Sequence, residues 1–114
     1  MSLNIDQIAE AFCSYRFAAT YPYMADEIKW SIVGKEELVG REAVIDRCDR
    51  SAKFLETVST TVTKLKINRT ETSVVVEGAA QFQDQKNLPS SVASCDVFNF
   101  RMGDFLRLHH TSLS

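Results

Sequence analysis

The chain has 114 residues, with 45% hydrophobic and 25% charged side chains and a formal net charge of −2. These values suit a single compact domain, 1–114, with a core of useful size. Acidic and basic residues are interspersed, which excludes the basic footprint of a nucleic-acid-binding or membrane-surface protein. No apolar run approaches the roughly 20 residues of a membrane span, and residues 1–6 lack the features of a signal peptide. We therefore expect a cytoplasmic protein that binds neither nucleic acid nor membrane.

The first half of the chain is predicted to contain two helices that flank one strand. Residues 4–18 should form an amphipathic helix, because apolar residues recur there at spacings of three and four: Ile5, Ile8, Phe12 and Tyr15. A short turn over 21–24 precedes a strand over 27–33, which alternates so that Ile28, Trp30 and Ile32 share a face. A loop over 34–40 then leads into a second helix over 41–55.

The second half is predicted to consist of strands, over 57–68, 73–82, 92–101 and 105–111. Residues 83–90 are polar and should form a loop, and residues 102–104 should form a hairpin turn. Helices followed by a run of antiparallel strands indicate an α+β fold, with the helices packed on one face of a curved sheet. Such a sheet leaves a conical hollow, which is a natural ligand cavity.

Three cysteines, Cys13, Cys48 and Cys95, are odd in number and widely spaced. No Cys-x-x-Cys pair occurs, so the sequence predicts neither a disulfide framework nor a structural zinc site. We expect all three in or near the core, where a free cysteine behaves as a small hydrophobe. Asp96 and one histidine are too few ligands for a metal site, and we expect no metal and no cofactor.

One carboxylate falls on an otherwise apolar strand face. Asp96 alternates in register with Val92, Phe98 and Phe100, which should face a core or a pocket. A buried carboxylate is costly unless it is paired, hydrogen-bonded or protonated. Two interpretations of Asp96 stay open: a structural partner of Tyr15 or of backbone amides, or an acid that faces a ligand.

The last strand supplies a histidine that could join Asp96. His109 and His110 point to opposite faces, and His110 shares its face with Leu108, so His110 is the inward one. Beside Asp96 it would form an acid/base pair; the alternative is a satisfied or outward histidine. Tyr15 either contacts the pocket or is satisfied within the core. Apolar residues on the inward faces are expected to form the ligand-binding walls: Trp30, Ile32, Phe82, Phe98 and Leu108.

Three segments in order carry a family resemblance: 24–30 (MADEIKW), 39–45 (VGREAVI) and 95–100 (CDVFNF), the last followed by Gly103. Together they resemble the nuclear transport factor two-like superfamily, which includes the SnoaL-like proteins and the ketosteroid isomerases. The resemblance covers nearly the whole chain and implies a cone-shaped, cystatin-like α+β fold, a deep pocket and frequent homodimers. It does not imply one function, because this fold hosts isomerases, cyclases, hydrolases and non-catalytic domains.

The ketosteroid isomerases sharpen this expectation. Their chemistry needs a carboxylate base, together with a Tyr and a protonated Asp that hold the developing oxyanion. The resemblance places Asp96 at the position of that Asp and Tyr15 at that of the Tyr. The position of the base falls on Ile32 or on Ser31, depending on the motif from which it is counted. Neither side chain can abstract a carbon-bound proton, so the isomerase base is missing.

Three functions remain open on this sequence. The first is a lyase-, isomerase- or cyclase-type enzyme for a small, apolar, cyclic substrate, with Asp96, Tyr15 and His110 as catalytic groups. The second is a non-catalytic, homodimeric ligand-sensing domain with the same pocket. The third is a homodimeric interaction module, favoured by Val97 and Phe105 on the sheet face opposite the pocket. An open cavity with converging polar groups favours the first two, and a fully packed cone favours the third.

Overall fold

The structure is a computed structural model that describes residues 2–84 and 89–113; residues 85–88 of the predicted loop lie outside the described residues. The described elements are α1 (Ile5–Cys13), η1 (Phe17–Tyr23), β1 (Met24–Ile32), β2 (Glu36–Val39), α2 (Arg41–Leu55), β3 (Ser59–Arg69), β4 (Ser73–Gln83), β5 (Ser90–Arg101) and β6 (Asp104–Ser112). η1 is a 3₁₀ helix whose last residues cover positions 21–23 of the turn predicted over 21–24, and β1 begins at Met24, three residues before the predicted start of that strand.

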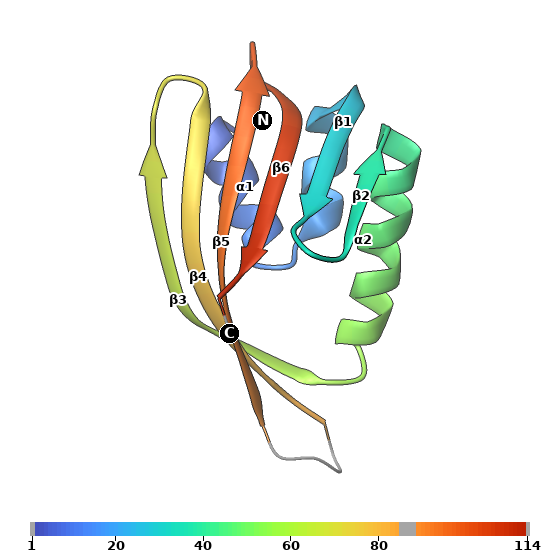
Figure 1. The fold of residues 1–114 in the computed structure, drawn as a ribbon, viewed down its shortest axis with the longest axis vertical. Helices are drawn as coiled ribbons and strands as arrows, with labels where there is room; N and C mark the ends of the chain where they lie inside the picture. Colours follow the sequence, from blue (N-terminus) through green and yellow to red (C-terminus); the bar gives the residue numbers. More distant parts are fainter. Residues whose placement is uncertain (1, 85–88, 114) are drawn as a thin grey trace.

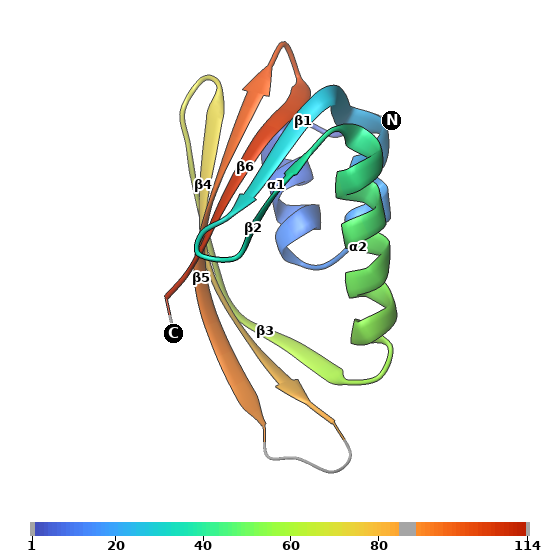
Figure 2. The same ribbon diagram turned by 45° about the vertical axis from the view of Figure 1, so that its right-hand side comes forward.

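The six strands form one curved sheet in the order β2-β1-β6-β5-β4-β3, with α1 and α2 on its concave face (Figures 1 and 2). The predicted α+β fold, with helices over one face of a curved sheet, is confirmed. Strands β3 to β6 form an antiparallel meander, as expected. However, β6 ends the meander beside β1 and runs in the same direction as β1, so the sheet is mixed rather than wholly antiparallel.

The first helix is shorter than predicted because the chain turns sharply at Tyr15. α1 begins with a capping box at Asn4 and ends at Cys13. Tyr15 then adopts a left-handed conformation (φ 66°), and the amide of Arg16 donates to a helix carbonyl at 2.8 Å. This is the Schellman arrangement, which usually places glycine where Tyr15 stands. The prediction that the helix continues to residue 18, with Tyr15 on its inner face, is therefore wrong.

The predicted loop over 34–40 contains a short strand. β2 pairs with β1 at the sheet edge, with Leu38 opposite Trp30 and Glu36 opposite Ile32. Only four residues long and almost entirely exposed, β2 has no alternating apolar pattern of its own. Its strand conformation comes from the ladder with β1, which local sequence cannot reveal.

The core is built around the ring of Phe12, which lies against Phe17, Trp30, Phe98 and Phe105 at centroid distances of 5.0, 5.3, 5.8 and 5.7 Å. These contacts are edge-on, the arrangement that aromatic quadrupoles prefer. Together the rings form the centre of the core between α1 and the sheet. Three of them, Phe12, Phe17 and Trp30, also border a cavity.

Phe105 belongs to this core, contrary to the expectation that it lies on the outer face. The pairing of β5 with β6 shifts register beside the hairpin, which breaks the simple alternation of β6. As a result Phe105 is fully buried, as is Leu108 three residues later. Val97 does lie on the outer face, where it is half-buried.

Candidate functional site

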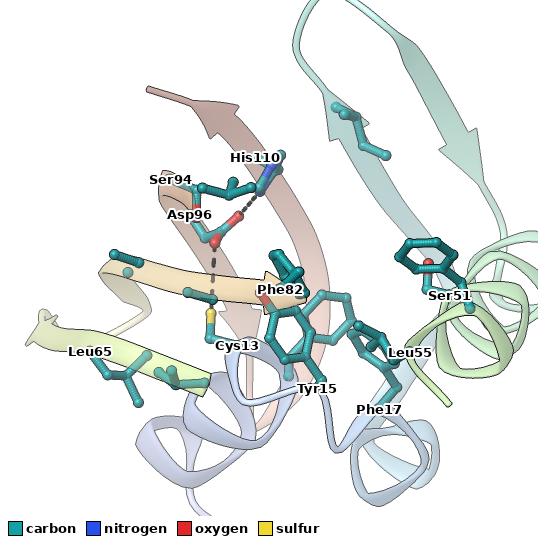
Figure 3. Close-up of a pocket in the computed structure, with 18 of the residues that line it drawn as sticks. Cys13, Tyr15, Phe17, Ser51, Leu55, Leu65, Phe82, Ser94, Asp96 and His110 are labelled. Carbon is teal, nitrogen blue, oxygen red and sulfur yellow. Dashed lines mark hydrogen bonds and ion pairs between the residues drawn. The ribbon is translucent and has the colours of Figure 1, made fainter. Parts of the chain in front are cut away.

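A cavity of about 620 Å³ lies between the concave face of the sheet and the two helices. Exposed side chains from the β1–β2 turn, α2 and β3 stand at its mouth: Lys35, Arg50, Phe54 and Val62. Buried or half-buried side chains from α1, β1 and the central strands form its inner wall, part of which Figure 3 shows. The cavity is therefore open to solvent, and its volume suits a small organic molecule.

Asp96 of β5 and His110 of β6 meet on this inner wall. The two residues are direct partners across the antiparallel ladder, and Oδ1 of Asp96 lies 2.5 Å from Nδ1 of His110 (Figure 3). Their side chains are 11% and 28% exposed, respectively. Because an ionised carboxylate only accepts hydrogen bonds, Nδ1 of His110 is the donor in this contact when Asp96 is ionised. The structure thus brings together the acid and the histidine that the sequence singled out.

Cys13, rather than Tyr15, contacts the other oxygen of Asp96. The thiol donates to Oδ2 at 3.7 Å from the last residue of α1 (Figure 3). Burial, and then the charge of Asp96, raises the pKa of the Cys13 thiol well above its ordinary value, so the thiol keeps its proton and acts as a donor. The sequence pattern did not point to Cys13, because a helix running to residue 18 would have put Tyr15 in line with Phe12.

Tyr15 also lines the cavity, with its ring edge-on to Phe17 at 6.0 Å and to Phe82 at 5.9 Å. Within the described part of the chain its hydroxyl has no hydrogen-bond partner. Burial raises the pKa of Tyr15, and the nearby Cys13 and Asp96 add to the rise. The hydroxyl therefore keeps its proton and can donate to a ligand. The left-handed backbone costs on the order of 1 kcal/mol for such a residue, and strain of this kind often persists at functional sites.

The five predicted wall residues divide into two groups. Trp30, Ile32 and Phe82 line the cavity. Phe98 and Leu108 are almost fully buried in the core and are not part of the cavity wall. The ring of Phe12 covers Phe98, which is why a residue on the correct strand face does not reach the ligand space.

Comparison with known proteins shows what this arrangement resembles. A nuclear transport factor two-like protein of unknown function from Cytophaga hutchinsonii is 25% identical over 93% of each chain, with a TM-score of 0.83. The chain belongs to the nuclear transport factor two-like superfamily. An LEH-like epoxide hydrolase from M. tuberculosis has a TM-score of 0.69 and 16% identity, over 95% of this chain and 78% of that one.

A third structure extends the comparison. It is a protein with a ketosteroid isomerase-like fold from Catenulispora acidiphila, in complex with trimethylamine, with a TM-score of 0.69 and 16% identity over 91% of this chain and 83% of that one. No protein-family model and no curated protein matches the chain. At these identities the last two likenesses show the fold, and the site must be judged from its own residues.

Ile32 and Ser31, the two positions that could correspond to the isomerase base, point to different surroundings. The side chain of Ile32 lines the cavity. Ser31, the next residue along β1, instead donates to Oε2 of Glu37 at 3.0 Å. Ile32 therefore occupies the inward position, where it offers no proton acceptor.

The cavity is also lined by basic residues, which the sequence pattern did not predict. Lys35, Arg47, Arg50 and Lys64 are among the lining residues. Periodicity locates apolar faces, whereas these side chains come from a turn, a helix and an edge strand that meet only in the folded chain. No local pattern in the sequence signals such a cluster.

Two structural findings concern metals and membranes. Within residues 2–84 and 89–113, no three His, Cys, Asp or Glu side chains are grouped so that they could hold a metal ion. The same residues include no helix with the length and apolarity needed to cross a membrane.

Cys13, Cys48 and Cys95 are free thiols.

Proposed function

We propose that the protein binds an apolar, ring-containing small molecule in this cavity and moves a proton on it, with His110 as the general base. The observation that carries this proposal is the hydrogen-bonded pair of Asp96 and His110 on the inner wall of an open cavity. A purely structural acid would be expected to be enclosed by the core, and this one faces the space that a ligand would fill.

In this proposal each polar group has a distinct task. Asp96 accepts the Nδ1 proton of His110, which fixes the tautomer in which Nε2 has a lone pair. Nε2 would take a proton from a carbon next to a ligand carbonyl, and the resulting imidazolium would be stabilised by Asp96. The Tyr15 hydroxyl would donate to the developing enolate oxygen. Return of the proton to another carbon is an isomerisation. The same enolate could instead expel a leaving group from its β-carbon as a C=C bond forms, or attack an electrophilic carbon of the same ligand and close a ring.

Proton exchange tests this proposal without knowledge of the natural substrate. 2-Tetralone is an apolar bicyclic ketone with exchangeable protons next to its carbonyl. Incubated in D₂O with the protein, it should gain deuterium faster than in buffer alone, as measured by mass spectrometry. His110→Gln should reduce the enzyme-dependent rate by roughly a hundredfold, because it removes the base.

His109→Gln is the matched control. His109 is exposed, and its neighbouring position on β6 places it on the outer face of the sheet. This variant should retain the wild-type exchange rate. Equal exchange rates in wild type and His110→Gln would contradict the catalytic proposal. If the ketone nevertheless bound to both proteins, the non-catalytic ligand-sensing function would be the one supported.

A further inference from the structure

The charges that line the cavity are unlike those of the chain as a whole. The sequence has 13 basic and 15 acidic residues. The lining residues include the four basic side chains described above and one acidic residue, Asp96. Thus a chain with a negative net charge presents an excess of positive charge to the cavity.

Three of the basic side chains stand on two sides of the mouth. One face of α2 supplies Arg47, Arg50, Ser51 and Phe54, at the spacings of three and four that put helix residues on a common face. Lys35 comes from the turn between β1 and β2. Asp96 lies at the inner wall, so the positive and negative groups occupy different depths.

The ion pairs of these residues leave them able to bind a ligand. Arg50 pairs with Asp46 at 3.3 Å, and both side chains are largely exposed. Exposed pairs of this kind contribute little free energy, so a ligand anion can compete for the cation. Lys35 has no ion-pair partner within the described residues. Each of these cations can therefore turn to a group at the mouth.

Arg47 is held more firmly. Its guanidinium donates to Glu36 at 3.0 Å and to Ser51 at 2.5 Å, and it lies 5.9 Å from the ring centroid of Trp30. Contact with an aromatic face fixes the plane of a guanidinium. Because Trp30 is itself a lining residue, Arg47 is kept where the apolar wall meets the charged mouth.

We propose that the ligand carries an anionic group, a carboxylate or a phosphate, which Lys35, Arg47 and Arg50 hold at the mouth of the cavity. This inference rests on the proposed function, because it concerns the ligand of the same cavity. The apolar ring of the ligand fills the space beside Trp30. The negative charge of Asp96 opposes entry of the anionic end first, so the ring faces Asp96 and His110. The natural ligand is therefore an amphipathic acid rather than a neutral hydrocarbon or an amine.

Three probes that share one ring system test this inference: 2-naphthoate, 2-naphthyl phosphate and neutral methyl 2-naphthoate. Dissociation constants come from isothermal titration calorimetry at pH 7.5. At least one anion should bind roughly tenfold or more tightly than the ester, since two or three cations contribute. Its advantage should shrink as NaCl rises from 50 to 500 mM, because the mouth is exposed to solvent. The preferred anion distinguishes a carboxylate from a phosphate ligand.

Substitutions at the mouth of the cavity test whether its cations cause the preference for anions. Lys35→Gln and Arg50→Gln should each weaken anion binding about three- to tenfold and leave ester binding unchanged. Arg107→Gln removes the same charge from an exposed position on β6 that is not among the lining residues, and should change neither. Trp30 is the only tryptophan of the chain, so its indole NMR resonance reports whether each probe enters the cavity.

The outcomes separate this inference from the proposed function. Anions that bind no more tightly than the ester, or that lose as much affinity in Arg107→Gln as in Arg50→Gln, would overturn the anionic-ligand inference. Binding of the ester in that case would leave the proposed function standing. Absence of binding by all three probes, with no deuterium exchange into 2-tetralone, would overturn both.

Discussion

Ile32 of β1 and His110 of β6 are direct neighbours across two parallel strands, and both side chains line the cavity. By resemblance to the ketosteroid isomerases, the carboxylate base would stand at Ile32 or at Ser31, depending on the motif from which it is counted, and of these two Ile32 lines the cavity. The imidazole of His110, on the neighbouring strand, is hydrogen-bonded to Asp96 and borders the same part of the cavity as Ile32. Under the proposed function, His110 on β6 takes the role that a carboxylate on β1 plays in the ketosteroid isomerases.

The hydroxyl of Tyr15 should matter to the ligand and not to the fold. Tyr15→Phe removes a group with no partner in the described structure, so the free energy of unfolding in urea should change by less than about 0.5 kcal/mol. The exchange rate of 2-tetralone should fall roughly tenfold to a hundredfold, because a donor to the enolate oxygen is lost.

Tyr21→Phe is the comparison for this prediction. The Tyr21 hydroxyl donates to Oδ1 of Asp49 at 2.6 Å, outside the cavity with Asp96. Its removal should cost about 1 kcal/mol of stability and leave the exchange rate unchanged. Loss of stability in Tyr15→Phe without an effect on exchange would show that the Tyr15 hydroxyl is structural.

Two phenylalanines distinguish the core from the cavity wall. Phe98→Ala should destabilise the protein by about 3–5 kcal/mol, because it deletes a fully buried ring. Phe82→Ala should cost about 1 kcal/mol or less, since Phe82 is half-buried and lines the cavity. Calorimetry with methyl 2-naphthoate should show weaker binding to Phe82→Ala. Similar destabilisation by both substitutions would contradict the assignment of Phe82 to an open wall.

The three cysteines should differ in reactivity. Burial raises the pKa of Cys48 to about 12 and that of Cys13 still further from its ordinary value. A raised thiol pKa means less thiolate at pH 8, so iodoacetamide should modify both residues slowly in the native protein. Cys95 is half-buried on the outer face of β5 and should be labelled first, as peptide mass spectrometry would show. Faster labelling of Cys13 would mean that its contact with Asp96 is not maintained.

A homodimer through the outer face of the sheet stays a prediction. Val75 of β4 and Val97 of β5 are cross-strand partners there, and both are half-buried in a single chain. His109 of β6 is the partner of Val97 on its other side. Light scattering at micromolar concentration should give twice the mass of one chain. Val97→Glu should give the mass of one chain, while Val39→Glu, on the exposed edge strand β2, should not. A single-chain mass for the wild type would refute the dimer.

Local pattern was sufficient for much of the fold. The second helix has its predicted bounds, and the strands from β3 onward differ from prediction by only a few residues at their ends. Their periodicity is strong, and little competes with it. β2 was missed because an edge strand of four residues depends on its neighbour. α1 was extended too far because an αL conformation is rare for a tyrosine, so the sequence pattern did not suggest that the helix stops before Tyr15.

The candidate site was predictable only where it depended on strand alternation. Asp96 and His110 were placed on the inward face by that rule, and the structure pairs them. Strand alternation shows which face a side chain is on, but not whether a helix covers it. It could not predict that the ring of Phe12, on α1, packs against Phe98. Cys13 was not identified as a lining residue because the predicted helix ran past it to residue 18. Arg47 was not identified because α2 meets the cavity only in the folded chain.

The central claim is that Asp96 serves His110 and a ligand rather than the stability of the fold. Asp96→Asn keeps an oxygen that can accept from Nδ1 but removes the charge that stabilises an imidazolium. The account predicts that the 2-tetralone exchange rate falls by about tenfold or more, while the melting temperature changes by only about 4–8 °C, the effect of one hydrogen bond. A much larger fall in melting temperature with an unchanged exchange rate would contradict it and make Asp96 a structural acid.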